Sequence, residues 1–500
     1  MRQVIHPQMQ FGEQDISAIE FDPRSRDDIP QILRGLQYIY TTPELRERVF
    51  AILSEVAPAS TVEGKNGPAD TSTGRPGMEQ WKILVLGTLR LGLNADIDRI
   101  HELANQHNTL RRLLGHGDWA DDTQYNLQTL KDNLRLFTPE LLDRINQEVV
   151  SAGHALIKKS PQEPLNGRCD SFVVETDVHY PTDINLLFDA MRKTVEVCAS
   201  FCDEHALTDW RQSAYNIRKL KKLYRHAQRI KHSTAKDEAK REARRDEIKA
   251  AHQAYLEQAE DDVRRARDTR MTLMIGCDVL PALLAELDAY IAHAERQIDQ
   301  IRRRVIFGQT IPHEEKVFSI FEPHTEWISK GKAGVPVELG LRVCVLEDQD
   351  RFILHHRVME KLTDDQVIVA MVKETRTRFP RLASISTDKG FHSRANQRDL
   401  AELLDRVVVP KKGKRSAADQ AREGDPEFIR LRRQHSAVES AINALEVHGL
   451  DRCRDHGIRG FKRYVAMAVV ARNIQRLGAI LYAQDRAREK RKRGPYKQAA

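Results

Sequence analysis

The sequence predicts an α/β fold in which a mixed sheet forms the core, a helical region precedes it, and a long helical insertion interrupts it. β-Branched runs typical of strands begin only near residue 169 and resume after residue 312. Before and between these runs, apolar residues recur at helical spacing. The chain of 500 residues is also longer than one hydrophobic core usually serves, so we expect several domains.

Three segments are expected before the sheet. Residues 1–56 form an N-terminal helical segment, and residues 57–77 gather Pro, Gly, Ser and Thr as a linker does. Residues 78–160 contain several short helical patterns separated by turns, so we expect a helical DNA-binding region there. An ordinary helical bundle is the alternative interpretation of this region, because it lacks a sharp helix-turn-helix fingerprint.

The sheet core is expected in residues 165–184 and 312–484, with its first strand from about Cys169 to Val178. Its later elements, in order, are expected to be strands at 316–323, 337–348 and 351–360, a helix at 363–378, a strand at 383–388, a helix after 397, a strand at 406–410 and long helices from 426 to 484. This order of strands and helices is that of a ribonuclease-H-like mixed α/β sheet with a helical insertion after its first strand.

Residues 185–311 are expected to be that insertion, because their helical pattern is long and densely charged, as in a solvated helical hairpin. Residues 485–500 form a basic tail. Together with a net charge of +7 and a pI near 9.0, the basic clusters at 218–222 and 410–415 favour nucleic acid as a partner.

The six cysteines are scattered, and a zinc site would need two closely spaced pairs of ligands, which they do not provide. We therefore expect reduced structural thiols. The N-terminus lacks a basic-then-apolar leader, and no apolar run is long enough for a membrane span. These features lead us to expect a cytoplasmic protein without a membrane partner. Glycine-rich phosphate loops, zinc-finger spacings and dinucleotide fingerprints are also missing from the sequence.

Three acidic residues in the expected core are candidate catalytic residues and metal ligands. Asp170 lies near the start of the first strand, Asp388 closes a later strand, and Glu439 lies in a helix. Phosphodiester chemistry at neutral pH uses hard divalent cations such as Mg²⁺ or Mn²⁺, which prefer carboxylate oxygens. Strand ends and a helix across the sheet are expected to bring the three side chains together.

Each candidate has an alternative. Asp388 precedes Lys-Gly and suits an ordinary turn as well. Asp177 competes with Asp170, because the two positions are seven apart and side chains alternate across a strand, so only one can be the ligand. Glu439 is distinguished from other helix glutamates by its flank of Ala437, Val438, Ala441 and Ile442 and by the basic residues upstream.

Three strings, "CDSFVVETDVHYPTDINLL", "STDKGFHSRANQRDL" and "RRQHSAVESAINALEVHGLDRCRDHGIRG", resemble the active-site regions of bacterial insertion-sequence transposases of the DDE class. Asp170 with Ser171 matches the first aspartate, Asp388 with Gly390 and Phe391 the second, and Glu439 the glutamate. "GRPGMEQWKILVLGTLRLGLN" is similar to the helical DNA-binding region of such enzymes.

The resemblance implies an enzyme that binds the terminal inverted repeats of an insertion sequence, hydrolyses a phosphodiester and transfers the freed strand to target DNA. It further implies two Mg²⁺ or Mn²⁺ ions, double-stranded DNA as partner, a homodimer or higher oligomer on DNA, and a nucleoid-associated location. The basic residues expected to contact DNA are Lys411, Lys412, Arg432, Arg433 and His435.

Two departures from the family pattern stand out. Glu446 occupies a position, seven after Glu439, at which several relatives carry a basic residue, and residues 185–304 are longer than in compact members. The insertion is expected to serve dimerisation or contact with the transposon end, with a passive solvated hairpin as the alternative. The alternative for the whole chain is a catalytically inactive, transposase-derived DNA-binding protein.

Overall fold

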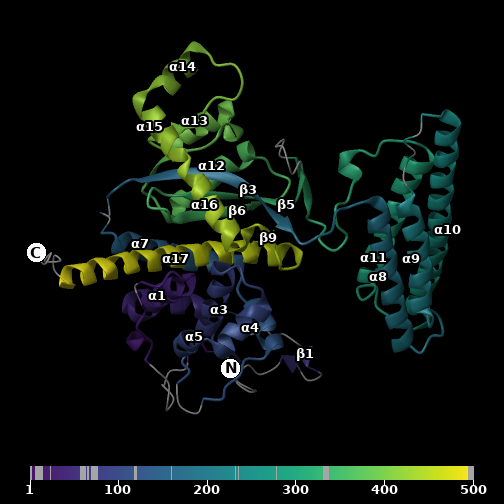
Figure 1. The fold of residues 1–500 in the computed structure, drawn as a ribbon, viewed down its shortest axis with the longest axis horizontal. Helices are drawn as coiled ribbons and strands as arrows, with labels where there is room; N and C mark the ends of the chain where they lie inside the picture. Colours follow the sequence, from purple (N-terminus) through teal and green to yellow (C-terminus); the bar gives the residue numbers. More distant parts are fainter. Residues whose placement is uncertain are drawn as a thin grey trace, which may run out of the picture. The chain divides into compact units, whose positions relative to one another are not determined.

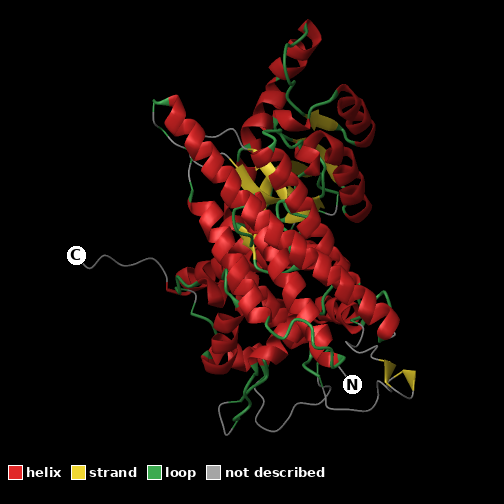
Figure 2. Ribbon diagram, turned by 90° about the vertical axis from the view of Figure 1, so that its right-hand side faces the viewer, coloured by secondary structure: helices red, strands yellow, loops and turns green. Residues whose placement is uncertain are grey.

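A computed structural model describes residues 3–5, 15–22, 24–56, 63–64, 67–68, 77–117, 121–158, 160, 162–230, 232, 234, 236–277, 279–329 and 337–493. The chain divides into two compact units, Met1–Asp177 with Ile328–Ala500, and Val178–Trp327. We call them unit 1 and unit 2. Helices predominate, and a mixed sheet lies within unit 1, which confirms the expected α/β class (Figures 1 and 2).

The N-terminal half of unit 1 is helical, as predicted. Its α-helices are α1 (Asp28–Thr41), α2 (Pro43–Ser54), α3 (Gln80–Gly92), α4 (Ile97–Gln106), α5 (Asn108–Leu113), α6 (Leu127–Leu134) and α7 (Pro139–Leu156). Capping sets several of their starts: the Asp27 carboxylate accepts the Ile29 N–H, and the Thr138 hydroxyl accepts the Leu141 N–H. Most of the predicted linker at 57–77 lies outside the described residues, apart from the two-residue strands β1 (Glu63–Gly64) and β2 (Gly67–Pro68).

Among the described residues, seven strands form the main sheet. They are β3 (Leu165–Thr176), β4 (Glu326–Ser329), β5 (Val337–Glu347), β6 (Ile353–Met359), β7 (Leu382–Ser386), β8 (Arg406–Val408) and β9 (Arg452–Cys453). Their order is β4-β5-β3-β7-β8, with β6 also on β5 and β9 also on β3. β3 is antiparallel to β5 and parallel to β7 and β9, and β7 is parallel to β8. β3 is therefore the central strand of a mixed sheet.

The remaining helices of unit 1 follow the sheet strands. They are α12 (Asp364–Arg378), α13 (Arg394–Leu403), α14 (Ala417–Gly424), α15 (Pro426–His435), α16 (Ala437–Leu445) and α17 (Gly457–Arg493). The long helices predicted from 426 to 484 are thus interrupted. Gly449, with a φ of 108°, lies in the π-type turn Glu446–Leu450 and gives the backbone a conformation that ends the helix before β9.

Alternation along β3 decides which helices its side chains face. Phe172 belongs to a core shared with α16, α17 and the N-terminal helices, whereas Cys169 belongs to a core shared with α12 and α13. Because neighbouring residues of a strand point to opposite faces, Asp170 lies on the α16 side and Ser171 on the α12 side. Neighbouring residues of β3 thus face different layers of helices.

Unit 2 is helical and contains the insertion expected at 185–311. Its helices are α8 (Asp183–Glu204), α9 (Ser213–Arg229), α10 (Glu238–Gly276) and α11 (Ala285–Ile301), followed by a π-type turn at Arg302–Ile306 (Figure 1). Their shared core includes the buried side chains of Leu187, Trp210 and Tyr255. α10 covers the long charged helix expected from the sequence.

The strand predicted at 316–323 is wrong. The Ser319 hydroxyl accepts hydrogen bonds from the N–H groups of Phe321 and Glu322, so the chain turns locally instead of joining a ladder. The strand of this region, β4, begins at Glu326.

All six cysteines are free thiols, as predicted. Within the described residues, no helix is long and apolar enough to cross a membrane. The expected basic tail at 485–500 continues α17 up to Arg493, and residues 494–500 lie outside the described residues.

Candidate active site

The three candidate carboxylates come from separate elements that meet beside the middle of β3. Along one edge of β3, β7 pairs as far as Arg168, opposite Ser386, and β9 pairs again from Glu175. No described strand pairs with this edge between those points, and Asp170 lies there. Asp388 follows β7 by two residues and so comes to the same place, where the strands diverge. Divergence of neighbouring strands creates a crevice in α/β sheets.

The pKa of Asp170 is affected by the neighbouring acidic groups. Burial raises the pKa of Asp170 to about 6 against the opposing hydrogen bond from the Ser171 N–H, and the negative charges of Asp388, Asp364 and Glu439 raise it further. Like charges that face one another in a partly desolvated place disfavour ionisation. Among the residues that the structure describes, none forms an ion pair with Asp170 or with these three carboxylates.

Asp388 has the turn role considered for it from the sequence. Its Oδ1 accepts the Gly390 N–H at 2.8 Å and caps the short 3₁₀ turn Lys389–Phe391, as an ordinary turn aspartate does. A Cβ on Gly390 would lie 3.0 Å from Asp388 Oδ1 and 3.1 Å from Asp364 Oδ2. Gly390 therefore leaves room for two carboxylates to approach the same point.

Asp364 was not among the residues identified from the sequence. It begins α12, and its Oδ1 accepts a hydrogen bond of 2.6 Å from the Ser171 hydroxyl. In the sequence it stands in "LTDDQ", an ordinary helix start with two acidic residues, and nothing local sets it apart. Only the pairing of β3 with the sheet, which turns Ser171 toward α12, identifies it.

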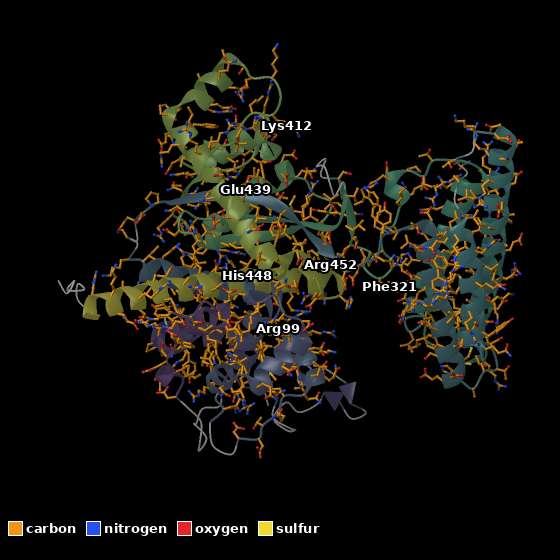
Figure 3. The ribbon with its side chains drawn as sticks, in the orientation of Figure 1. Arg99, Phe321, Lys412, Glu439, His448 and Arg452 are labelled. Carbon is orange, nitrogen blue, oxygen red and sulfur yellow. The ribbon has the colours of Figure 1, made fainter. Side chains whose placement is uncertain are left out.

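Glu439 lies in the first turn of α16 and is exposed, and its carboxylate forms no hydrogen bond or ion pair with another described residue (Figure 3). Its neighbours Val438 and Ala441 are buried, so the predicted apolar flank packs α16 onto the sheet. The carboxylate oxygens of Asp170, Asp388 and Glu439 are not all within 4.8 Å of one another, which is the spacing expected for the ligands of one metal ion. Rotation of the unpaired Glu439 side chain can change that separation.

His435, which is expected to contact DNA, is partly buried. Its Nδ1 is 3.3 Å from the Ser386 hydroxyl. Burial lowers the pKa of His435 to about 4, with a further lowering by Arg168 and an opposing effect of Glu439. The imidazole is therefore neutral at pH 7 and acts as a hydrogen-bonding group between β7 and the α15–α16 junction.

Arg168, which was not identified from the sequence either, forms hydrogen bonds beside this junction. It lies two residues before Asp170, on the same side of β3, and donates to the Asp348 carbonyl at 2.6 Å and the Gln434 carbonyl at 3.5 Å. Arg168 is also 3.7 Å from the Glu347 carboxylate. A basic residue two positions before the aspartate was the available sequence signal.

The other residues expected to contact DNA lie on the surface of unit 1. Lys412, Arg432 and Arg433 are exposed and form no ion pair with another described residue, whereas Lys411 is 3.9 Å from Asp419. Arg433 also lines a cavity of about 390 Å³ that continues from β3 and β7 toward α16. Figure 3 shows Lys412 near the end of unit 1 that carries α14, away from Glu439.

The rival strand residue Asp177 lies just beyond the end of β3. Its Oδ1 is 3.4 Å from Arg452, which also pairs with Glu175 at 3.2 Å. Because β3 ends at Thr176, alternation along the strand does not fix the direction of Asp177. Its carboxylate has a cationic partner, whereas Asp170, Asp388 and Glu439 form no ion pair with another described residue.

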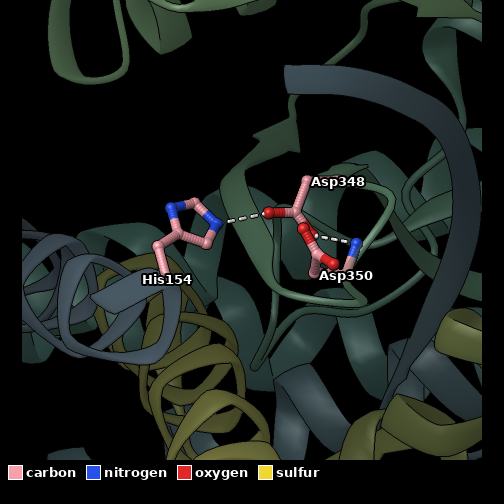
Figure 4. A group of neighbouring side chains, drawn as sticks. All are labelled: His154, Asp348 and Asp350. Atoms are coloured by element: carbon pink, nitrogen blue, oxygen red, sulfur yellow. Dashed lines mark hydrogen bonds and ion pairs between the residues drawn. The ribbon is translucent and has the colours of Figure 1, made fainter. Parts of the chain in front are cut away.

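One group in the described part of the chain has metal-ligand spacing: His154, Asp348 and Asp350 offer ligand atoms that all lie within 4.8 Å of one another (Figure 4). His154 Nε2 is 2.6 Å from Asp348 Oδ2, and Asp348 Oδ1 accepts the N–H groups of Asp350 and Phe352. These contacts occupy both Asp348 oxygens and shape the β5–β6 turn. We interpret the group as a structural link between α7 and the sheet.

No protein-family model, no curated protein and no solved structure matches this chain. The functional argument therefore depends on the geometry of the carboxylates and on the sequence pattern.

Proposed function

We propose that this protein is a DNA transposase of the DDE class, a metal-dependent enzyme that cleaves phosphodiester bonds at the ends of an insertion sequence and joins them to target DNA. One observation carries the proposal: Asp170 is partly buried where β7 and β9 leave the edge of β3, the charges of Asp388, Asp364 and Glu439 raise its pKa, and none of these carboxylates forms an ion pair with another described residue. Uncompensated carboxylates that converge on one place are costly unless a cation binds.

The order of elements supports a ribonuclease-H-like core. β3, β5 and β6 are joined antiparallel, and β7 and β8 extend the sheet in parallel on the other side of β3, with α12 and α13 between them. Unit 2 follows β3 directly, where an insertion is expected.

The donor set fits a hard divalent cation. Asp170, Asp388 and Glu439 offer oxygen atoms only, which suits Mg²⁺ or Mn²⁺ and gives no preference to zinc. When bound, such ions lower the pKa of water and stabilise the charge that develops on the phosphate. The chain's own residues complete the site: Ser171 and Asp364 hold β3 to α12, and neutral His435 holds the helix junction beside Glu439.

Exposed cations on unit 1 suit a DNA substrate. Arg432 and Arg433 lie on α15, just before the helix of Glu439, and Lys412 lies on the loop that precedes α14. Exposed, unpaired cations bind phosphates and release counterions. We expect the DNA to be a terminal inverted repeat first and target DNA second, bound by a dimer or higher oligomer.

The test is cleavage of a supercoiled plasmid that carries the coding region with its flanking DNA. The proposal predicts nicking or linearisation at the element ends in Mg²⁺ or Mn²⁺ and none in EDTA. Binding to the ends without cleavage in either metal would instead favour the inactive, transposase-derived DNA-binding protein. Absence of both binding and cleavage would contradict the two assignments together.

A further inference from the structure

Helix α9 of unit 2 differs from its neighbours in the sign of its charges. Between Ser213 and Arg229 it carries no acidic residue and six lysines and arginines: Arg218, Lys219, Lys221, Lys222, Arg225 and Arg229. The neighbouring helix α10 carries both signs along its whole length. A helix of one charge sign on a mixed-sign helical unit attracts a partner of the opposite sign.

Four of the six cations form one stripe. Arg218, Lys222, Arg225 and Arg229 recur at intervals of three and four residues and are all exposed. At 1.5 Å per residue and 100° per residue, they lie along one face over about 16 Å. The buried residues Leu220 and Ala227 lie on the opposite face, against α8 and α10. We call these four residues the α9 stripe.

The stripe is unpaired, in contrast to the arginines of α10. None of its four side chains forms an ion pair with any residue that the structure describes. On α10, Arg244 pairs with Glu247 at 2.5 Å, Arg245 with Glu238 at 2.6 Å and Arg264 with Asp261 at 3.1 Å. Lys219, outside the stripe, faces α10, since its charge lowers the pKa of Asp262 against the raising effect of burial.

The apolar face of α9 is already covered, which disfavours a membrane surface as its partner. Tyr224 stacks on Phe188 of α8 with ring centroids 4.9 Å apart, and its hydroxyl donates to Asn185 at 2.9 Å. A helix that inserts into a lipid interface needs a free apolar face to bury. Apart from Tyr215, the exposed side chains of α9 are mainly charged or polar, as in a surface that contacts phosphates without inserting.

We infer that the α9 stripe binds the phosphate backbone of double-stranded DNA, so that unit 2 holds DNA independently of the carboxylate site. This inference rests on the proposed function for the identity of its partner. Four regularly spaced cations over about 16 Å match a polyanion whose charges repeat every few ångströms along the duplex. Because contacts to phosphates carry no sequence information, the contact is independent of DNA sequence.

The test uses the full-length chain with Asp170→Asn, which prevents cleavage during the measurement, and a labelled random-sequence DNA duplex. Fluorescence anisotropy gives the affinity at several salt concentrations. Replacing Arg218, Lys222, Arg225 and Arg229 together by Gln should lower the affinity at least tenfold and make the slope of log affinity against log salt shallower by about 3 to 4. The stripe lies opposite the buried face, and circular dichroism checks that the helices remain.

A matched control removes the same charge from α10 through Arg241, Arg244, Arg245 and Arg264, each changed to Gln. This control should change the salt slope by less than about 1, because its arginines are already paired. An equal loss in both variants, or none in the stripe variant, would overturn the inference.

Two competitors identify the partner. Anionic vesicles or double-stranded RNA that bind more tightly than DNA in a stripe-dependent way would also overturn the inference. Failure of the proposed function can be told apart from failure of this inference. The proposed function is tested by DNA cleavage with intact Asp170, whereas the inference is tested by DNA binding with Asp170→Asn. A chain that never cleaves but loses affinity in the stripe variant supports the stripe and contradicts the transposase.

Discussion

The Ser171 hydroxyl donates a hydrogen bond of 2.6 Å to Asp364 Oδ1 and so joins the central strand to the first turn of α12, although the residues are 193 positions apart. Asp364 also adds to the negative charge that raises the pKa of Asp170. The bond therefore fixes the N-terminal end of α12 next to Ser171, which directly follows Asp170.

This bond leads to the first prediction. Ser171→Ala and Asp364→Asn should each lower metal-dependent DNA cleavage by roughly 10- to 100-fold, as loss of a residue that orients metal ligands typically does. The measurement is the cleavage rate as a function of Mn²⁺ concentration, in which the midpoint should move to higher metal. Asp365→Asn is the matched control from the same helix turn. Unchanged rates and midpoints in both variants would mean that Asp364 is only a helix-start residue.

The second prediction concerns pH and metal. Because the pKa of Asp170 rises from 3.8 to about 6, ionising this group costs stability in the folded state. That cost appears as the pH rises from about 4 through about 6 and is fully present above about 7. Asp170→Asn should therefore raise the metal-free melting temperature at about pH 8 by roughly 2 °C or more and remove its share of the dependence between about pH 4 and 6.

Added Mg²⁺ should raise the melting temperature of the wild-type chain more than that of Asp170→Asn, because a cation that binds only the folded chain stabilises it. Differential scanning fluorimetry at several pH values measures both effects. An Asp170→Asn protein that melts lower than wild type in EDTA at about pH 8 would contradict the electrostatic account.

Third, His435 and its basic neighbours should affect DNA binding differently. His435 is neutral at pH 7 because burial lowers its pKa to about 4, so His435→Gln should leave the salt dependence of DNA affinity unchanged. Arg432→Gln with Arg433→Gln should make that slope shallower by about 2. The measurement is anisotropy at several salt concentrations. A His435→Gln slope that falls as much as that of the arginine pair would show a charged histidine on the DNA.

A fourth prediction follows from the packing of the N-terminal helices on α17. Leu33 of α1, Leu84 of α3 and Leu477 of α17 share one core, although α17 begins only at Gly457. A Cβ on Gly478 would overlap the Gln31 carbonyl oxygen. Gly478→Ala should therefore destabilise the full chain by about 1 to 3 kcal/mol, as overpacking does.

The same packing predicts that a fragment of residues 1–160 lacks a cooperative thermal transition. Its DNA binding is best tested in the full chain for that reason. Near-ultraviolet circular dichroism during melting measures the transition, and a sharp melt of the isolated fragment would show that α17 is dispensable.

Much of the fold could be predicted because local signals and tertiary structure agree. The β-branched run of β3 depends on residues close in sequence, and the strand found at Leu165–Thr176 overlaps the expected Cys169–Val178. β9 could not be predicted, because a two-residue strand exists only through its pairing with Glu175 and Thr176 of β3. The residues at 316–323 look like a strand, but the Ser319 side chain gives their backbone a local alternative.

For the candidate site, the sequence pattern identified carboxylates whose spacing resembles a known class. It did not identify Asp364 or Arg168, whose neighbours come from other strands and helices. The charge state of His435 could not be predicted from the sequence either. Burial determines it, and this burial follows from the packing of α15 on β7. Each of these contributions depends on long-range contacts that leave no local pattern.

The most direct test of the central claim is strand cleavage by three variants in which each acid becomes its amide: Asp170→Asn, Asp388→Asn and Glu439→Gln. The amides keep the shape of the side chains but lose the charge that holds a hard cation. A labelled duplex bearing the element's terminus serves as substrate in Mg²⁺, with circular dichroism to verify folding and Asp177→Asn as control. We predict that all three variants bind the duplex and lose cleavage and joining, while Asp177→Asn retains both. Cleavage at the wild-type rate by all three variants would contradict the active site, and an inactive Asp177→Asn beside an active Asp170→Asn would move the ligand along the strand.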